Sequence, residues 1–432
     1  MAGTSRKRAG AAPALPLWLR RPGWASVLVA LLAAALAIAL WAARAQQPLL
    51  ERIDRLSLDA QMQWRGRLAP APAPALTSDG GPGVLLLCID DASLQRLGGF
   101  VPDRRALAQA ISALHAADAK LIALDLLLLD PARPDPSADV ALAEAMRAAG
   151  NVLIPFALVA EPGPGAGSSS APPAGAALLD SALLRYGGEQ ARERLPLRPA
   201  RLLAPLDALA GAAAALGHVS AQRGLDGAVR YDLPALPFEG EVYPSLALRS
   251  AALAAGVDWR QAQVQFGEAV QLGRLRLPLD ALSRQWLNYY GPAGTFETLS
   301  FIDLLDGRIA PERLRGRLVL IGVTALGAGD HFPSPFDASL PGVERLATAI
   351  DNILSGRSLQ RPAWAAPAEL AAMLLLPLLA ALLIARWPAR WALPALAGVA
   401  LALVGLLQAL FVQQQLFVAP AFPALALLLG SL

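Results

Sequence analysis

Two aspartates stand directly after apolar runs of the kind that form buried strands. Asp90 follows Val84–Ile89, and Asp125 interrupts a second such run. We expect the two runs to be adjacent parallel strands, and open parallel α/β sheets bind ligands at the carboxyl ends of their strands. Two carboxylates there suit a cation, a basic ligand, or an ion pair with Arg104 or Arg105. The sequence leaves open a second interpretation, in which these aspartates cap helices or form a buried ion pair.

Further polar residues follow later runs. Asp226-Gly-Ala-Val-Arg230 is typical of a turn into a strand, with the glycine at positive φ. Gly322-Val-Thr324 follows the run 318–323 and is able to present backbone N–H groups to an anion. It lacks the Gly-rich loop and Lys of a nucleotide site, so nucleotide binding is not expected there. His218 and His331 are expected to be hydrogen-bonded structural residues, with pH sensing as the alternative.

The motifs of enzymes and metal sites are absent from this sequence. It has one cysteine and three histidines without metal-ligand spacing, and it lacks Gly-x-Ser-x-Gly, His-Glu-x-x-His and Ser-x-x-Lys. Ser93 follows two aspartates, but no histidine is placed near it by the sequence. We therefore expect no catalytic residue, no metal and no cofactor in this chain.

Four apolar segments indicate a membrane protein. The segment 24–43 has twenty uncharged residues, enough to cross a hydrocarbon core of about 30 Å. It exceeds the apolar region of a cleaved signal peptide, which is the competing interpretation. Further spans are expected at 363–385, 391–412 and 416–432. Basic residues in 1–23 and at Arg386 and Arg390 place these flanks inside, which leaves 44–362 outside the cytoplasmic membrane.

The basic balance of the chain belongs to these flanks. Of 37 Lys and Arg residues, five lie in 1–23 and two in 363–432, so 44–362 holds 30 basic against 33 acidic residues. Composition is 55% hydrophobic and only 16% charged, which disfavours an ordinary cytosolic enzyme. A nucleic-acid-binding surface is not implied, and the bilayer is the expected partner.

The region 44–362 has the pattern of an α/β domain with a mainly parallel sheet. Apolar runs at 84–89, 121–128 and 151–156 alternate with helical spacing at 103–117 and 137–149, which predicts a βαβαβ arrangement. Residues 160–175 are rich in Gly, Ser and Pro and are expected to form a flexible loop. Other expected elements are helices at 49–64, 203–215, 243–255, 300–306 and 343–354, a strand pair at 217–220 and 227–233, and strands at 286–290 and 318–323.

The order of local motifs resembles a known family. In sequence come Ile89-Asp-Asp-Ala-Ser-Leu94, Arg104 after Pro102, Ile122-Ala-Leu-Asp125-Leu, Gly217-His-Val, Asp226-Gly-Ala-Val-Arg230, Leu287-Asn-Tyr-Tyr-Gly-Pro292, Val319-Leu-Ile-Gly-Val-Thr324, Asp330, Pro341-Gly-Val-Glu344 and Ala349-Ile-Asp-Asn352. They resemble the type-2 CHASE domain, an extracellular sensory domain associated with bacterial adenylate cyclases, histidine kinases and diguanylate cyclases. The resemblance covers about 50–360, and one leading span with three trailing spans also matches it.

The resemblance has departures. Phe100-Val-Pro-Asp103 stands where the family tends to have a Trp-Pro turn, and Arg345-Leu-Ala-Thr348 replaces an Ile-His-Ala-Asn pattern. If the missing His and Asn bind a ligand or order the membrane-proximal region, this chain differs there. The cytoplasmic catalytic domain usual in such proteins lies outside this sequence. The candidate ligand-binding residues are Asp90, Asp91, Ser93, Arg104, Asp125, Arg230, Thr324 and Asp330.

The expected function is that of a sensory module in the inner membrane. A small-molecule or envelope signal would bind the periplasmic domain 44–362, and the helix 343–354 would pass the change through Arg361-Pro362 to the trailing spans. These would reposition a cytoplasmic cyclase or kinase effector, in a homodimer. Two alternatives stay open, namely a scaffold whose outer domain binds a partner protein or cell-envelope component, and a tethered hydrolase or binding protein. The sequence does not identify the ligand.

Overall fold

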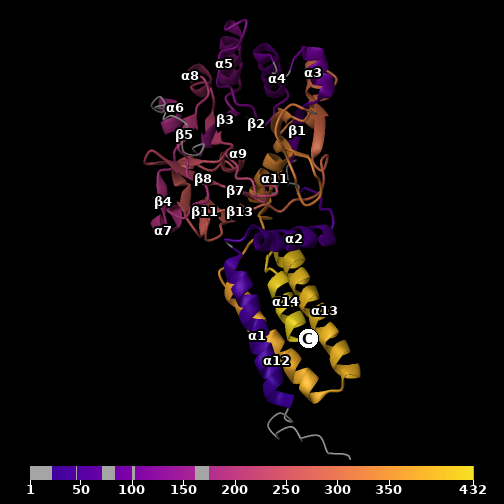
Figure 1. The fold of residues 1–432 in the computed structure, drawn as a ribbon. Coiled ribbons are helices and arrows are strands. Elements are labelled where there is room, and N and C mark those ends of the chain that lie inside the picture. The colour runs from indigo at the N-terminus through magenta and orange to yellow at the C-terminus, as the bar shows by residue number, and fades with distance from the viewer. Residues whose placement is uncertain are drawn as a thin grey trace, which may run out of the picture. The chain divides into compact units, whose positions relative to one another are not determined.

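The computed structural model describes residues 22–44, 46–70, 83–99, 103–160, 175–325 and 327–431. The chain divides into two compact units (Figure 1). The helical unit comprises Met1–Leu58, Trp364–Ala409 and Val418–Leu432, and the α/β unit comprises Asp59–Ala363 and Leu410–Phe417. All but the ends of the predicted loop 160–175 and the residues Phe100-Val-Pro102 lie outside the described residues.

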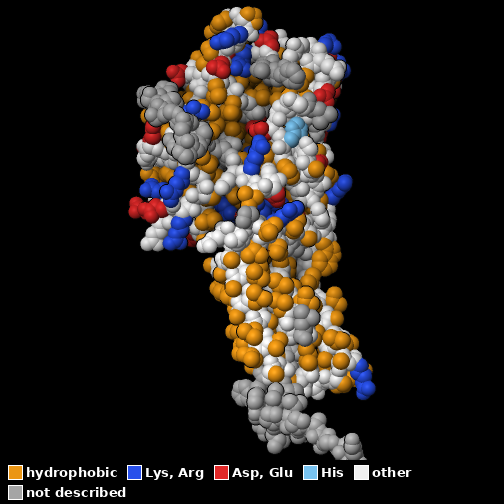
Figure 2. Space-filling view, in the orientation of Figure 1, with side chains coloured by type: hydrophobic (Ala, Val, Ile, Leu, Met, Phe, Trp, Pro, Cys, Tyr) orange, Lys and Arg blue, Asp and Glu red, His pale blue; other side chains and the backbone are white. Residues whose placement is uncertain are grey.

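Three helices of the helical unit are long and apolar enough to cross a membrane. They are α1 (Pro22–Ala43), α12 (Ala365–Arg386) and α13 (Ala389–Gln414). Ala and Leu dominate all three, and both are strong helix formers. Hydrophobic side chains cover the visible surface of these helices (Figure 2), as expected of segments that face lipid. Small residues such as Ala37 and Ala426 are buried where the helices pack together.

A buried carboxylate ties this bundle together. Glu369 of α12 is 1% exposed and accepts hydrogen bonds from the Trp41 Nε1 at 3.0 Å and the Ala419 backbone N–H at 2.9 Å. A charged residue within a span is costly unless it is paired inside the bundle. The acid that interrupts the second apolar run therefore fixes α1 and the chain before the last helix against α12.

The last expected span, 416–432, differs in the structure. Its helix is α14 (Ala421–Gly430), which has ten residues and is therefore about 15 Å long, half of the roughly 30 Å hydrocarbon core. Pro420 precedes its first residue and Pro423 lies in its first turn, where proline is tolerated best. Residues 410–417 belong to the α/β unit.

The α/β unit is built on a mixed, mainly parallel sheet, as the sequence predicts. Its strand order is β14-β1-β15-β2-β3-β5, with β6 also paired to β3; β5 alone runs antiparallel within the described sheet. The strands are β1 (Val84–Ile89), β2 (Leu121–Leu124), β3 (Val152–Val159), β5 (Arg201–Leu203), β6 (Ala215–His218), β14 (Glu297–Ser300) and β15 (Leu318–Val323).

Helices cover both faces of this sheet (Figure 1). One layer contains α3 (Asp91–Leu97), α4 (Arg104–Ala116), α5 (Ser137–Ala149) and α10 (Phe301–Leu305), and Leu85, Leu87 and Ile89 of β1 face it in one core. The other layer contains α9 (Leu246–Ala254) and α11 (Gly342–Ser355). Because both faces are covered, β1 and β2 are buried throughout and read as continuous apolar runs.

Smaller elements complete the unit. They are α2 (Pro48–Arg65), β4 (Arg185–Gly187), β7 (Tyr231–Asp232), β8 (Ala235–Phe238), β9 (Glu241–Pro244), β10 (Gln263–Gln265), β11 (Ala269–Leu272), β12 (Leu275–Pro278), β13 (Gln285–Trp286), β16 (His331–Phe332), β17 (Leu340–Pro341), and the short helices α6 (Ala176–Leu179), α7 (Glu189–Arg192) and α8 (Asp207–Ala210). Two 3₁₀ turns lie at Trp259–Gln261 and Pro311–Arg313. The helix α2 begins in the helical unit and ends in the α/β unit.

Several sequence expectations need correction. The strands β1 and β2 are not adjacent, since β15 lies between them; hydrophobic patterns carry no strand order. The expected pair 217–220 with 227–233 does not form, because β6 pairs with β3 and β7 with β13. The helix expected at 203–215 is reduced to α8 between β5 and β6. The Ala-rich stretch around Gly211 has helical spacing in the sequence, but only Asp207–Ala210 form a helix, which ends at Gly211.

Candidate functional site

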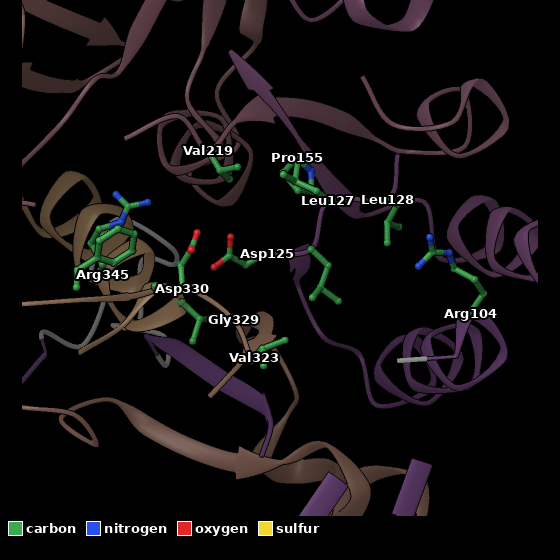
Figure 3. A pocket seen from close by; sticks show the side chains of 14 residues that line it. Arg104, Asp125, Leu127, Leu128, Pro155, Val219, Val323, Gly329, Asp330 and Arg345 are labelled. Carbon is green, nitrogen blue, oxygen red and sulfur yellow. The ribbon is translucent and has the colours of Figure 1, made fainter. Parts of the chain in front are cut away.

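A cavity of about 490 Å³ opens at the carboxyl ends of β2 and β15 (Figure 3). It lies where α/β sheets commonly bind ligands. Its apolar wall contains Leu127, Pro155 and Val219, while its polar lining contains Arg104, Asp125, Asp330 and Arg345. Three of the eight candidate residues, Arg104, Asp125 and Asp330, therefore lie in one cavity.

Asp125 provides the central carboxylate of this cavity. Its backbone N–H donates to the Ile321 carbonyl at 2.7 Å, which extends the pairing of β2 with β15 and fixes where its side chain emerges. Burial raises the pKa of Asp125 to about 6; the Arg345 charge opposes this shift and the Asp330 charge adds to it. Within the described part of the chain, its carboxylate accepts no hydrogen bond. Asp125 thus neither caps a helix nor forms a close ion pair.

Asp330 also lines the cavity, from the loop before β16, and its charge acts on Asp125 (Figure 3). The loop is held by its own backbone, because the Gly342 N–H at the start of α11 donates to the Asp330 carbonyl at 2.7 Å. Gly329, at φ +77°, lets the chain turn beside Val323, whose Cβ would lie 3.0 Å from an added Cβ. The Asp330 side chain is 75% exposed and lies 3.6 Å from Arg223, so it forms a rim.

The first turn of α11 forms another wall. Val343 lines the cavity and packs so tightly on β15 that a Cβ at Gly322 would lie 2.5 Å from its Cγ2. Gly322 is therefore needed for α11 to approach the strand ends. Gly322, which suggested an anion-binding turn, is thus needed for packing. The Thr324 and Ala325 N–H groups both donate to the Ile89 carbonyl and are therefore not directed at an anion.

Arg345 is a buried cation beside this cavity. It is 4% exposed, its Nη1 lies 3.1 Å from Asp232 Oδ1, and its guanidinium lies 5.9 Å from the Phe332 ring. Neither Arg345 Nε nor Asp232 Oδ2 has a hydrogen-bond partner among the described residues. His218 is also buried; desolvation, then the Arg345 charge, lowers its pKa to about 3. Its ring nitrogens have no partner in the described ranges, so the expected structural hydrogen bonds are absent there.

Arg104 closes the opposite edge of the cavity (Figure 3). Its Nε lies 3.1 Å from Asp139 Oδ1 of α5, and its Nη2 donates to the Asp130 carbonyl at 3.3 Å. Arg105 pairs instead with Asp135 at 2.6 Å. Neither arginine pairs with Asp90 or Asp125 as the sequence interpretation allowed; both anchor the segment 130–139 to α4.

Asp90 and Ser93 form a helix cap outside the cavity. Asp90 Oδ1 accepts from the Ser93 N–H at 2.9 Å and from its hydroxyl at 2.7 Å, which caps α3. Burial acts to raise the pKa of Asp90, but the Ser93 and Ser300 hydrogen bonds outweigh it and the pKa lies below its ordinary value. Asp91 begins α3 and is exposed. The capping interpretation is thus correct for Asp90.

Arg230 and Thr324 also lie outside the lining. Arg230 Nη2 lies 2.6 Å from Asp59 of α2 and 2.8 Å from Asp226, and its side chain is 8% exposed. The Asp226-Gly227 turn forms with Gly227 at φ +78°, as expected. Arg230 therefore fastens the end of α2 to the α/β unit. Thr324 follows β15 and does not line the cavity.

Sequence reasoning missed part of the site. Arg345 was noted as a departure from a family pattern, and Asp232 was passed over inside a short strand. The one available signal was an arginine on the apolar face of a helix, which requires a buried acid elsewhere. No group of three or more His, Cys, Asp or Glu side chains that could hold a metal ion occurs within the described ranges.

Comparison with known proteins gives one match. A family model described as CHASE2 domain matches residues 31–385. We find no match among curated proteins or among solved structures.

Proposed function

The chain belongs to the CHASE2 domain family, and from this premise we propose that it is a sensory receptor module of the inner membrane. The α/β unit would lie in the periplasm and bind a signal in the cavity at Asp125. The trailing helices would relay this event to a cytoplasmic output domain or protein, a cyclase or a kinase, in a homodimer. The basic residues Arg386 and Arg390, between α12 and α13, support this orientation.

The position of α11 is the observation that carries the proposal. Its first turn supplies Gly342, Val343 and Arg345 to the cavity lining, and residues 356–364 join its end to α12. A ligand that prefers one position of this turn would shift the equilibrium of the whole helix. The cavity and a membrane-spanning helix are therefore linked through one buried helix and a short connection.

The segment after α11 is also hydrogen-bonded to residues 415–417. The Gln360 N–H donates to the Gln415 carbonyl at 2.8 Å, and the Phe417 N–H donates to the Gln360 carbonyl at 2.8 Å. The Phe417 ring lies 5.7 Å from Trp286. Since 410–417 contains the end of α13 and precedes α14, a displacement of 356–361 would act on α12, α13 and α14 together.

The cavity favours a small organic cation with an apolar part. Asp125 and Asp330 both present carboxylates, and Leu127 is 43% exposed beside them. The two arginines of the lining are already paired with Asp139 and Asp232, so their charge is largely compensated. An ammonium or guanidinium ligand would neutralise the two facing carboxylates, while its carbon chain would lie on Leu127 and Val323.

The test uses the full chain in detergent with two panels of probes. Choline, agmatine and spermidine form the cationic panel, and succinate and glutarate form the anionic panel. A member of the cationic panel should raise the Tm of the wild type but not that of Asp125→Asn, each measured against its own unliganded sample. Binding should strengthen as the pH rises through about 6, because the carboxylate ionises there. Equal stabilisation by the dianions, or an equal response of Asp125→Asn, would contradict the proposal.

A further inference from the structure

A second cavity, of about 380 Å³, lies near the other end of α11 and carries the opposite charge. Arg65, Arg357, Asn288 and Gln415 form its polar lining, and the remainder is Leu68, Ala69, Phe411 and Val412. Every lining residue belongs to the α/β unit. Among the described residues, two arginines and no carboxylate therefore line a cavity that also has an apolar side.

Arg65, the last residue of α2, is partly buried without an anionic partner. Its Nη1 donates to the Asn288 Oδ1, its Nη2 donates to the Tyr289 carbonyl at 2.5 Å, and its guanidinium lies 5.7 Å from the Phe411 ring. All of these acceptors are neutral. Burial lowers the pKa of Arg65 to about 10, and only the distant Tyr290 opposes this shift. Its positive charge is thus positioned but not compensated.

Arg357 is held in a similar way. Its Nη1 donates to the Ala69 carbonyl at 3.2 Å, and its own carbonyl accepts from the Asn288 Nδ2 at 2.9 Å. Among the described residues, neither Arg65 nor Arg357 has a carboxylate within ion-pair distance. Asn288 thus bonds the guanidinium of Arg65 and the backbone of Arg357, which keeps the two residues on one cavity.

Two helices indicate the depth of this cavity relative to the bilayer. The helix α13 has 26 residues and is therefore about 39 Å long, whereas the hydrocarbon core is about 30 Å thick. Counted from Arg390 at its cytoplasmic start, the final turn with Phe411 and Val412 extends to headgroup level.

The helix α2 supports the same depth independently. Its large exposed apolar side chains recur at helical spacing and are Leu49 (75% exposed), Ile53 (40%), Leu56 (54%) and Trp64 (64%). A helix with such a stripe and charged residues on its other face lies in the membrane interface. Arg65 follows Trp64 directly, so two observations put an arginine of this cavity among lipid headgroups.

We propose that this cavity binds the phosphate of an anionic phospholipid of the outer leaflet. The guanidinium groups of Arg65 and Arg357 donate to the phosphate oxygens, an arrangement that suits arginine. The first carbons of the lipid lie on Phe411, Val412 and Leu68. This site goes beyond the proposed function and does not depend on which signal the cavity at Asp125 binds. It rests on the proposed orientation of α13, which spans the membrane with Arg390 on the cytoplasmic side. A bound lipid would join the ends of α2 and α13 and the segment after α11.

The test measures lipid retention by the full chain. The protein is purified in a neutral detergent, mixed with phosphatidylglycerol, phosphatidylcholine or inorganic phosphate, and examined by native mass spectrometry and by its Tm. Arg65→Gln and Arg357→Gln remove one cation each. Arg67→Gln is the matched control, because Arg67 is an exposed arginine nearby that does not line the cavity.

The proposal expects phosphatidylglycerol to be retained, and each cavity variant to retain it about fivefold less than the wild type. The Arg67→Gln variant should retain it normally. Arg65→Lys keeps the charge and should lose less than Arg65→Gln, which separates binding from misfolding. Equal retention of phosphatidylcholine, or no difference between cavity variants and control, would overturn the proposal. A Tm increase with inorganic phosphate alone, without lipid retention, would assign the cavity to soluble phosphate and overturn the lipid.

Discussion

The two cavities of the α/β unit differ in charge, although one helix reaches both. At the start of α11, Asp125 and Asp330 face a cavity whose arginines are already paired. Beyond its end, Arg65 and Arg357 line a cavity without a carboxylate. Among the described residues, the first cavity therefore contains a carboxylate without a close ion-pair partner, Asp125, whereas the second contains two arginines without one. Under the proposed function, the helix between these two sites would couple a cationic signal to the membrane helices.

What holds α11 between them is a set of buried polar contacts at both ends. At its start, Arg345 pairs with Asp232. Toward its end, Asn352 exchanges hydrogen bonds with the backbone of Asn288 and donates to the Tyr290 hydroxyl at 2.9 Å. Polar contacts of this kind are directional, so they specify the helix position more sharply than apolar packing alone. The predictions below test each part of this comparison.

The largest effect is expected at Arg345. Replacing it with Met leaves Asp232 buried without its cation, which should destabilise the α/β unit by about 3–5 kcal/mol. Arg223→Met is the matched control, since Arg223 also lies against the Phe332 ring, at 4.7 Å, but is 56% exposed. It should change stability by less than about 1 kcal/mol. Thermal unfolding of the full chain in detergent measures both, and equal effects would show that the buried pair does not anchor α11.

A smaller loss is expected at the other end of α11. Asn352→Ala removes the partners of two backbone groups of Asn288 and of the Tyr290 hydroxyl, which should cost about 2–3 kcal/mol. Thr348→Val is the control on the same helix, because the Thr348 hydroxyl bonds only the Glu344 carbonyl and its loss should cost under about 1 kcal/mol. The same unfolding assay applies. If Asn352→Ala were as stable as Thr348→Val, the hydrogen bonds of Asn352 would not hold the end of α11 in position.

Asp125→Asn should stabilise the unliganded protein. The folded-state pKa of about 6 lies above the ordinary value of 3.8, so the folded state holds its proton longer than the unfolded state does. The stability tied to that proton is present below about pH 4 and is lost as the pH rises through about 6. The variant should therefore exceed the wild type by about 3 kcal/mol at pH 7.5 and come within about 0.5 kcal/mol of it at pH 4. Unfolding at both pH values measures this, and a destabilised variant at pH 7.5 would indicate a structural carboxylate.

The smallest effect on stability belongs to Asp330. Its exposed pair with Arg223 is worth under about 0.5 kcal/mol, so Asp330→Asn should unfold like the wild type. The account nevertheless expects this variant to bind the cationic probes more weakly. Normal probe binding by Asp330→Asn would show that Asp125 binds the cation and that Asp330 does not contribute.

The sequence predicts the layers of this protein well and the site only in part. Continuous apolar runs at β1, β2 and β15 identify a buried parallel sheet, and twenty-residue apolar segments identify α1, α12 and α13. Strand order does not follow from such patterns. In the structure β15 lies between β1 and β2, and it separates Asp90 from Asp125. Asp125 and Asp330, both selected as candidates, line one cavity, whereas Asp90 caps α3 through Ser93.

The cavity lined by Arg65 and Arg357 could not be predicted from the sequence, for a related reason. Arg65, Arg357 and Phe411 come from segments far apart in the chain, and none has a local pattern that marks a site. Only the folded chain brings their side chains together. The amphipathic pattern of α2 can be seen in the sequence. That its last residue, Arg65, lines a cavity can be seen only in the structure.

Hydrogen exchange of the full chain in phospholipid nanodiscs tests the central claim most directly. It is measured with and without the cation that gives the largest Tm increase, on the wild type and on Asp125→Asn. The account predicts slower exchange at 124–128 and in the first turn of α11, together with altered exchange at 356–361 and 410–417, in the wild type alone. Protection confined to the cavity, with 356–361 and 410–417 unchanged, would contradict a relay from the signal to the membrane helices.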